Sequence, residues 1–153
     1  MDPTLFSVLR LLHFLGMSVW FAGTLTIAGD VRKTIARGKP HTEILAGRVD
    51  RALTVGAIAA VVTIISGLGL IFGLGGFGSV GPRIHTGFLL ALIVLGVEVM
   101  ALKPTVGRLG DALGTGDGRE LRPLAGRIAA LAGATHLLKF VILILMIFRI
   151  GGR

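Results

Sequence analysis

Four long stretches without charged side chains constrain this chain more than any other feature of its sequence. They are residues 11–29, 52–81, 84–97 and 128–148, the last interrupted only by Lys139. The hydrocarbon core of a bilayer is about 30 Å thick, so a helix of roughly 20 residues crosses it. The sequence therefore predicts an all-α integral membrane protein, a bundle of four helices at about residues 4–29, 50–74, 82–103 and 123–149.

The composition agrees with a membrane protein and excludes several classes of function. Hydrophobic residues make up 53% of the 153 residues and charged residues only 16%, whereas a soluble domain carries about 25% charged residues. The length favours a single transmembrane domain over residues 1–153. The absence of cysteine excludes disulfides, Cys-ligated zinc, iron–sulfur clusters and thiol nucleophiles. No Walker loop, HExxH motif or Ser/His/Asp order supports a hydrolase or a phosphotransferase.

The distribution of basic residues predicts the orientation. Eleven of the sixteen Lys and Arg residues fall in segments 30–51 and 103–127, which we interpret as two loops too short for an extra folded domain. Because cytoplasmic loops of membrane proteins carry an excess of Lys and Arg, both termini are expected on the non-cytoplasmic side. The net charge of +8 is then explained by the basic cytoplasmic loops, and no nucleic-acid partner is expected. The expected location is a bacterial-type inner membrane, with the lipid bilayer as surroundings.

Five nitrogen-bearing side chains are expected in the outer half of the membrane. They are Arg10, His13, His85, His136 and Lys139. At about 1.5 Å per residue, His13 lies roughly 12 Å, Lys139 roughly 15 Å and His136 roughly 20 Å from the outer boundary. Glu98 is expected near the cytoplasmic end, where it would pair with Arg51, Arg127 or Lys103. No carboxylate is therefore expected to neutralise the five cationic or imidazole groups.

Imidazoles flanked by cations in an apolar bundle are typical of a heme site. Neutral imidazole ligates iron, and Arg or Lys near an interface pairs with the propionates. Along the first helix His13, Gly16 and Trp20 share one face, so that the glycine leaves room for a ring edge and Trp20 packs against it. We predict heme b with His13 as axial ligand, His136 as its partner and His85 as the substitute. Arg10, Arg83 and Lys139 would pair with propionates.

A heme with two imidazole ligands favours electron transfer to or from a quinone or a tetrapyrrole, whereas an open sixth position would admit oxygen. Two other classes of function stay open. The intramembrane histidines, with Met17, would also suit a small transporter or a copper-permeation protein. Alternatively, they tie helices together in a structural membrane subunit. Small residues at helical spacing are common at plain helix contacts, and these glycine faces also predict a homo-oligomer.

The segment LRLLHFLGMSVWFAGTLTIAGDVRKTIARG resembles the opening helix of the HemJ-type membrane protoporphyrinogen oxidases and of the related CopD-like four-helix membrane proteins. The matching residues are His13, Gly16, Trp20, Gly23 and Arg32. The resemblance implies a heme b protein with the first-helix histidine as axial ligand, which oxidises protoporphyrinogen. The third span, RIHTGFLLALIVLGVEVM, lacks the Trp- and Lys-rich pattern of the HemJ-type proteins. The resemblance therefore does not identify the substrate.

Overall fold

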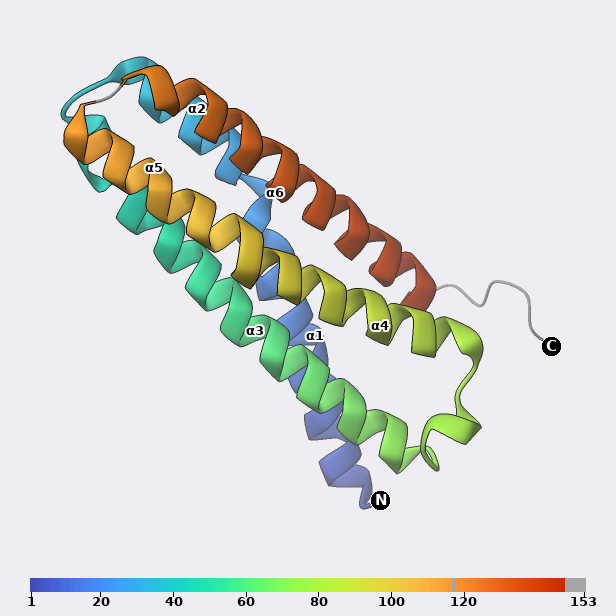
Figure 1. The fold of residues 1–153 in the computed structure, drawn as a ribbon. Helices are drawn as coiled ribbons and strands as arrows, with labels where there is room; N and C mark the ends of the chain where they lie inside the picture. Colours follow the sequence, from blue (N-terminus) through green and yellow to red (C-terminus); the bar gives the residue numbers. More distant parts are fainter. Residues whose placement is uncertain (117, 148–153) are drawn as a thin grey trace.

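The computed structural model describes residues 1–116 and 118–147 and shows an antiparallel bundle of long helices (Figure 1). The helices are α1 Pro3–Leu25, α2 Ile27–Arg37, α3 Leu45–Gly73, α4 Pro82–Val97, α5 Lys103–Thr115 and α6 Gly118–Ile147. Three short turns join them, namely the 3₁₀ turns η1 (His41–Ile44) and η2 (Phe77–Ser79) and the π-helical turn η3 (Glu98–Leu102). The predicted all-α fold is confirmed.

Consecutive elements combine into four continuous helical spans. They are Pro3–Arg37, His41–Gly73, Pro82–Thr115 and Gly118–Ile147, and each is long and apolar enough to cross a membrane. Local signals place two of the starts: Asp2 accepts a hydrogen bond from the Leu5 amide ahead of Pro3, and Pro82 occupies the first turn of α4. Between α3 and α4 the chain turns through Gly75 and Gly76, both at positive φ. The predicted end of the fourth helix at residue 149 lies outside the described residues.

The prediction that segments 30–51 and 103–127 are loops is wrong. Residues 30–37 continue as α2, and α5 continues the third span beyond the predicted end at 103. Charged side chains lower the mean hydropathy of these segments. An apolar face at helical spacing nevertheless remains, formed for example by Ile27, Val31 and Ile35. The first two of these are buried and Ile35 packs against their cluster. The helices therefore extend well beyond the uncharged runs.

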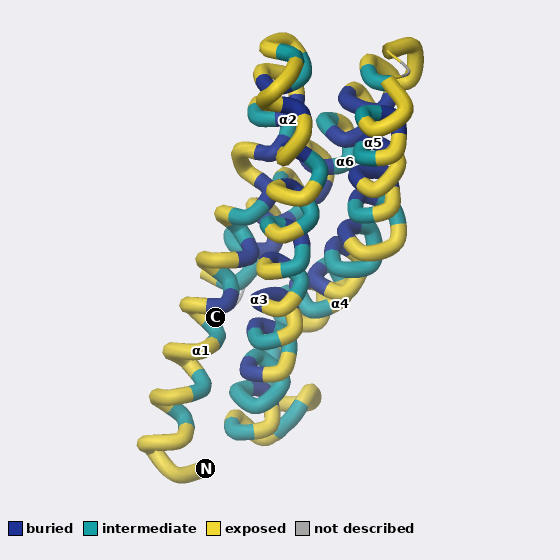
Figure 2. Tube along the Cα trace, turned by 90° about the vertical axis from the view of Figure 1, so that its left-hand side faces the viewer, coloured by how far each residue is buried: buried dark blue, intermediate teal, exposed yellow. Residues whose placement is uncertain are grey.

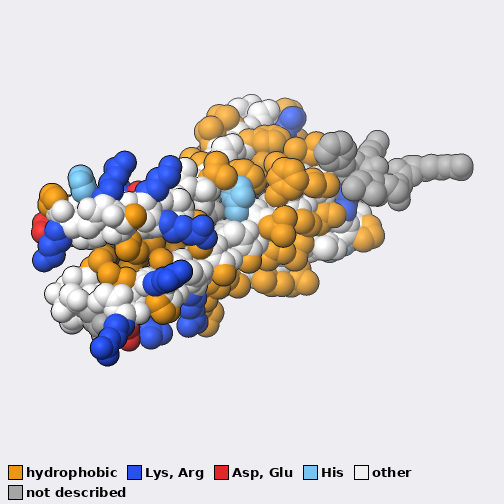
Figure 3. All heavy atoms as spheres, turned by 90° about the horizontal axis from the view of Figure 1, so that it is seen from above, with side chains coloured by type: hydrophobic (Ala, Val, Ile, Leu, Met, Phe, Trp, Pro, Cys, Tyr) orange, Lys and Arg blue, Asp and Glu red, His pale blue; other side chains and the backbone are white. Residues whose placement is uncertain are grey.

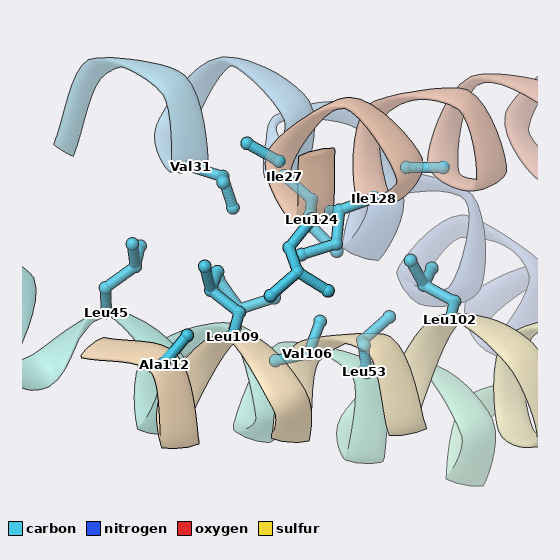
Figure 4. Packing of buried hydrophobic residues seen from close by; sticks show 13 residues of the cluster. Ile27, Val31, Leu45, Leu53, Leu102, Val106, Leu109, Ala112, Leu124 and Ile128 are labelled. Carbon is cyan, nitrogen blue, oxygen red and sulfur yellow. The ribbon is translucent and has the colours of Figure 1, made fainter. Parts of the chain in front are cut away.

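The two ends of the bundle differ in packing. We call the end formed by α2, η1, α5 and the first turns of α3 and α6 the basic end, and the opposite end the far end. A cluster of buried aliphatic residues fills the basic end (Figure 4); its members are Ile27, Val31, Leu45, Val49, Leu53, Leu102, Val106, Leu109, Ala112, Leu124, Ala125, Ile128 and Ala132. In Figure 3 most of the visible Lys and Arg side chains gather at this end, and hydrophobic side chains predominate over the middle of that face.

Toward the far end the bundle divides into two helix pairs. α1 packs along α3 and α4 packs along α6, whereas α3 and α4 touch each other little. Figures 1 and 2 show the pair α1/α3 diverging from the pair α4/α6, with the 74–81 connection joining them. A smaller buried cluster, which includes Trp20, Ala60 and Val94, holds the pairs together at the middle of the bundle. We call this level the waist; beyond it the diverging pairs leave room for a pocket.

Candidate functional site

An apolar pocket of about 210 Å³ lies between the two helix pairs on the far side of the waist. Its wall is formed by α1, α3, α4, α6 and the 74–80 connection. His13, Trp20 and Thr63 are the lining residues with nitrogen or oxygen in their side chains, and the rest are glycine, aliphatic, Phe or Met. The pocket thus offers a hydrophobic space with one imidazole beside it.

His13 is held in a defined orientation by α3. Its Nδ1 lies 2.9 Å from the carbonyl oxygen of Thr63. Because a carbonyl oxygen only accepts, the Nδ1 of the neutral ring must donate, which leaves the lone pair on Nε2. A backbone carbonyl commonly orients a metal-binding histidine in this way. The half-buried His13 ring therefore combines a fixed tautomer with a place on the pocket wall.

Two glycines allow α1 and α3 to approach closely enough for this contact. A Cβ at Gly67 would lie 3.0 Å from the His13 Cε1 atom, and one at Gly16 would lie 2.6 Å from the Thr63 Oγ1 atom and 3.0 Å from the Ala59 carbonyl oxygen. Gly67 lines the pocket. Gly16, for which we predicted a contact with a cofactor ring, lies instead at the helix contact and does not line the pocket.

A buried ion pair forms beneath the pocket, at the waist. The Lys139 Nζ lies 2.7 Å from the Glu98 Oε1, and the two side chains are only 3% and 5% exposed. Lys139 also donates to the Trp20 carbonyl oxygen at 2.8 Å and to the Thr24 Oγ1 at 3.2 Å. The Trp20 indole N–H donates to the Glu98 Oε2 at 2.6 Å, and the Lys139 amine lies 4.9 Å from the centre of the indole ring. The network joins α1, η3 and α6.

The expectation that no carboxylate neutralises the buried cations is therefore wrong, as is the expectation that Glu98 pairs with a cation at the cytoplasmic boundary. Depth in the membrane was counted from the ends of the uncharged runs, and this placed Glu98 and Lys139 at different levels. The spans are longer than predicted, and both residues lie level with Trp20. Lys103 bonds elsewhere, to Thr54. Since Lys139 is already paired, it is not a free cation for a propionate.

The π-helical turn η3, which carries Glu98, has a local cause. Pro104 has no N–H, and its ring would clash with the carbonyl of residue 100 in a regular helix. The backbone widens just before it, so that the Lys103 N–H bonds to the Glu98 carbonyl, five residues back. π-Helical turns often occur at functional sites, and here the turn holds Glu98 opposite Lys139.

The other two histidines predicted as ligands lie outside the pocket. The His136 ring packs on Phe21 at 4.4 Å between ring centres, and its buried Nδ1 has no hydrogen-bond partner. The exposed His85 stacks on Phe77, whose carbonyl oxygen lies 3.0 Å from its Nε2. The structure therefore does not bring His13, His136 and His85 together. Among residues 1–116 and 118–147 no group of three or more His, Asp or Glu could hold a metal ion.

The remaining predicted site residues lie toward the far end. Arg10 is exposed, one turn before His13, and Arg83 lies in the first turn of α4. Sequence reasoning missed Met146, which lines the pocket together with Met17. A Cβ at Gly87 would lie 2.7 Å from the Met146 Cε, so that glycine makes room for it. The spacing of Met146 from the buried Lys139, two turns apart on one helix face, is the signal that could have placed it.

The chain was compared with known proteins, and no protein-family model, curated protein or solved structure matches it. The features of the chain that bear on its function are the pocket beside His13 and the buried pair of Glu98 and Lys139.

Proposed function

We propose that the chain is a multi-pass membrane protein that binds heme b in the pocket, with His13 as an axial ligand and a role in electron transfer. Membrane insertion is supported by the four spans, each long and apolar enough to cross a bilayer, and by large exposed hydrophobic side chains such as Leu11, Phe14 and Leu15 on α1. The basic end then faces the cytoplasm. Both termini lie on the other side.

The observation that carries the heme proposal is the His13 imidazole, anchored through Nδ1 to Thr63 with Nε2 as the ligand atom. The apolar wall and the Trp20 ring suit a flat macrocycle. The pocket of about 210 Å³ is smaller than the roughly 300–1,000 Å³ typical of ligand sites. Heme binding therefore requires the helix pairs to move further apart at the far end. The slight contact between α3 and α4 and the glycines of the 74–81 connection favour such a movement.

Bound heme would supply one-electron chemistry, with a quinone, oxygen or a tetrapyrrole as the proposed partner. His13 would hold the iron, while Arg10 and Arg83 at the far end would pair with the propionates in place of Lys139. Because His136 and His85 lie outside the pocket, we propose that a thioether of the pocket wall, Met17 or Met146, or an external ligand would bind the iron together with His13. The resemblance to the HemJ-type and CopD-like proteins supports the same cofactor, on the residues of the first helix.

The test is the absorption spectrum of the detergent-purified protein from heme-replete cells. We expect a Soret band, with sharp visible bands after reduction, that disappears in His13→Ala. The matched control is His41→Ala, which removes an exposed histidine at the basic end and should leave the spectrum unchanged. A colourless wild-type protein, or a His13→Ala protein that keeps its colour, would overturn the proposal.

One observation favours copper permeation as the second candidate function. The His13 imidazole and the thioethers of Met17 and Met146 line the same pocket, and soft sulfur ligands with imidazole select Cu(I). In that case the purified protein is colourless but withdraws Cu(I) from a chromogenic chelator. Met146→Leu would weaken this binding, whereas the exposed Met100→Leu would not.

A further inference from the structure

We propose that the groove between α3 and α4 is a binding site for an anionic phospholipid, with an acyl chain in the groove and the headgroup against Arg51 and Lys103. The inference rests on the proposed insertion into a bilayer and is independent of heme. It concerns the outer surface of the bundle, because the groove shares no lining residue with the pocket beside His13.

The groove is open and entirely apolar. It has a volume of about 620 Å³, and its lining residues are Ala57, Ile58, Val61 and Val62 of α3 with Leu92, Leu95, Gly96, Val99 and Met100 of α4 and η3. Large side chains in it remain uncovered, since Ile58 is 61% and Met100 81% exposed. A Cβ built on Gly96 would meet nothing within 4 Å, which shows that the space beside this glycine is not filled by the protein.

Polar and charged groups close the groove at its basic end. The Lys103 amine donates to the Thr54 Oγ1 at 2.9 Å, and Thr54 lies one turn before Ile58 on α3. The exposed Arg51 lies seven residues before Ile58, on the same helix face. Asp50 is 3.6 Å from the Lys103 amine, too far for a hydrogen bond. Arg51, Lys103 and Asp50 together leave one net positive charge at the mouth of the groove.

This arrangement matches the two parts of a phospholipid. Arg51 lies about 10 Å along the axis from Ile58, at 1.5 Å per residue, so a headgroup phosphate at Arg51 places its acyl chain beside the apolar wall. Guanidinium groups bind phosphate through paired hydrogen bonds, and basic residues at the cytoplasmic boundary attract anionic headgroups. A zwitterionic lipid would gain the apolar contact but little from the net charge.

A second copy of the chain fits the groove less well. In a two-fold symmetric dimer whose copies have the same orientation in the bilayer, the same patch occurs on both subunits at the same depth, so Arg51 and Lys103 of one copy would lie near those of the other. The negative charge of an anionic lipid would instead be attracted to Arg51 and Lys103. The charge at the mouth of the groove therefore favours lipid as the occupant.

The test is native mass spectrometry of the delipidated protein titrated with phosphatidylglycerol or with phosphatidylcholine of the same acyl chains. We expect wild-type protein to bind one phosphatidylglycerol about fivefold more tightly than phosphatidylcholine, as one net charge near the headgroup predicts. The double variant Arg51→Gln/Lys103→Gln should lose this preference and bind phosphatidylglycerol no more tightly than phosphatidylcholine, because Asp50 then leaves one net negative charge at the mouth of the groove. Gly96→Leu should fill the groove and lose the bound lipid of either kind.

Matched variants separate the groove from general effects. Arg108→Gln removes another exposed basic residue of α5, and Gly133→Leu adds the same side chain to an open glycine of α6; both should behave as wild type. Equal binding of the two lipids by wild-type protein, or unchanged phosphatidylglycerol binding by Gly96→Leu, would overturn the proposal. A delipidated dimer that Gly96→Leu dissociates, with no lipid retained, would overturn it in favour of a second copy.

Discussion

At the scale of single residues, the Glu98–Lys139 pair is the feature with the largest expected consequence for stability. Two buried charges are costly to remove from water, and their attraction offsets that cost only when further hydrogen bonds satisfy them. Here the Trp20 indole and carbonyl and the Thr24 hydroxyl supply those bonds. The pair therefore ties α1, η3 and α6 together at the waist, whichever ligand the pocket takes.

Glu98→Gln should destabilise the protein by about 3–5 kcal/mol, because it leaves the Lys139 charge buried without its partner. Thermal and denaturant unfolding in detergent, followed by circular dichroism, measure the change. The emission of Trp20, the only tryptophan of the chain, should shift as well. Glu120→Gln, at an exposed glutamate of α6, is the control and should have no effect.

The double variant Glu98→Leu/Lys139→Met tests the reason for that loss. Removing both charges leaves no unpaired buried charge, only the Trp20 indole N–H without its acceptor, so the double variant should recover part of the stability that Glu98→Gln loses. A Glu98→Gln protein as stable as wild type, or a double variant no better than the single one, would show that the pair is not a structural tie.

At this scale, the sequence indicated residues of the pocket wall and the buried Lys139, but not the partners of these side chains. His13 and Trp20 stand out because they share a helix face with small residues, and the structure places both on the pocket wall. The partner of Lys139 could not be predicted, because hydropathy alone does not give the relative height of two helices that extend past their uncharged runs. Met146 was missed because a methionine among aliphatic residues is noticed only once Lys139, two turns before it on the same helix face, is known to be buried.

At the scale of elements, the helices that extend past the uncharged runs form the larger of the two buried hydrophobic clusters. α2 and α5 pack against the beginnings of α3 and α6 around fully buried residues such as Leu45, Val106 and Leu109. The four spans themselves were predictable from four uncharged runs. The extensions were not, because charged residues on one helix face lower the mean hydropathy of a segment while its opposite face still packs.

Leu109→Ala should therefore cost about 2–5 kcal/mol, as expected for a large-to-small change in a close-packed core. Leu89→Ala, at an exposed position of α4, is the matched control and should change the unfolding free energy little. Reversible unfolding in detergent measures both. Equal losses from the two variants would mean that the basic end is not the packed core that we describe.

At the scale of the whole molecule, a tightly packed basic end and a divided far end make the bundle asymmetric. The sequence predicts the number of spans and, through the basic residues, their orientation. It does not predict the divergence of the helix pairs, because the angles between helices depend on contacts such as Gly16 against Thr63. The pocket is a consequence of that divergence and was likewise not predictable.

The proposed orientation can be tested directly, since the chain contains no cysteine. Ser79→Cys places one thiol in the far-end connection, and Glu43→Cys places one in η1 at the basic end; both positions are exposed. A membrane-impermeant maleimide added to spheroplasts should label the first variant at once, and the second only after permeabilisation. The opposite pattern would reverse the proposed topology.

Titration of the purified heme-free protein with hemin, followed by Trp20 emission, is the decisive test of a heme site at His13. Heme absorbs where tryptophan emits, and the only indole of the chain lies on the pocket wall. We expect saturable quenching at one hemin per chain that is lost in His13→Ala and kept in His41→Ala. Quenching that does not saturate, or that is the same in His13→Ala as in wild type, would contradict a heme site at His13.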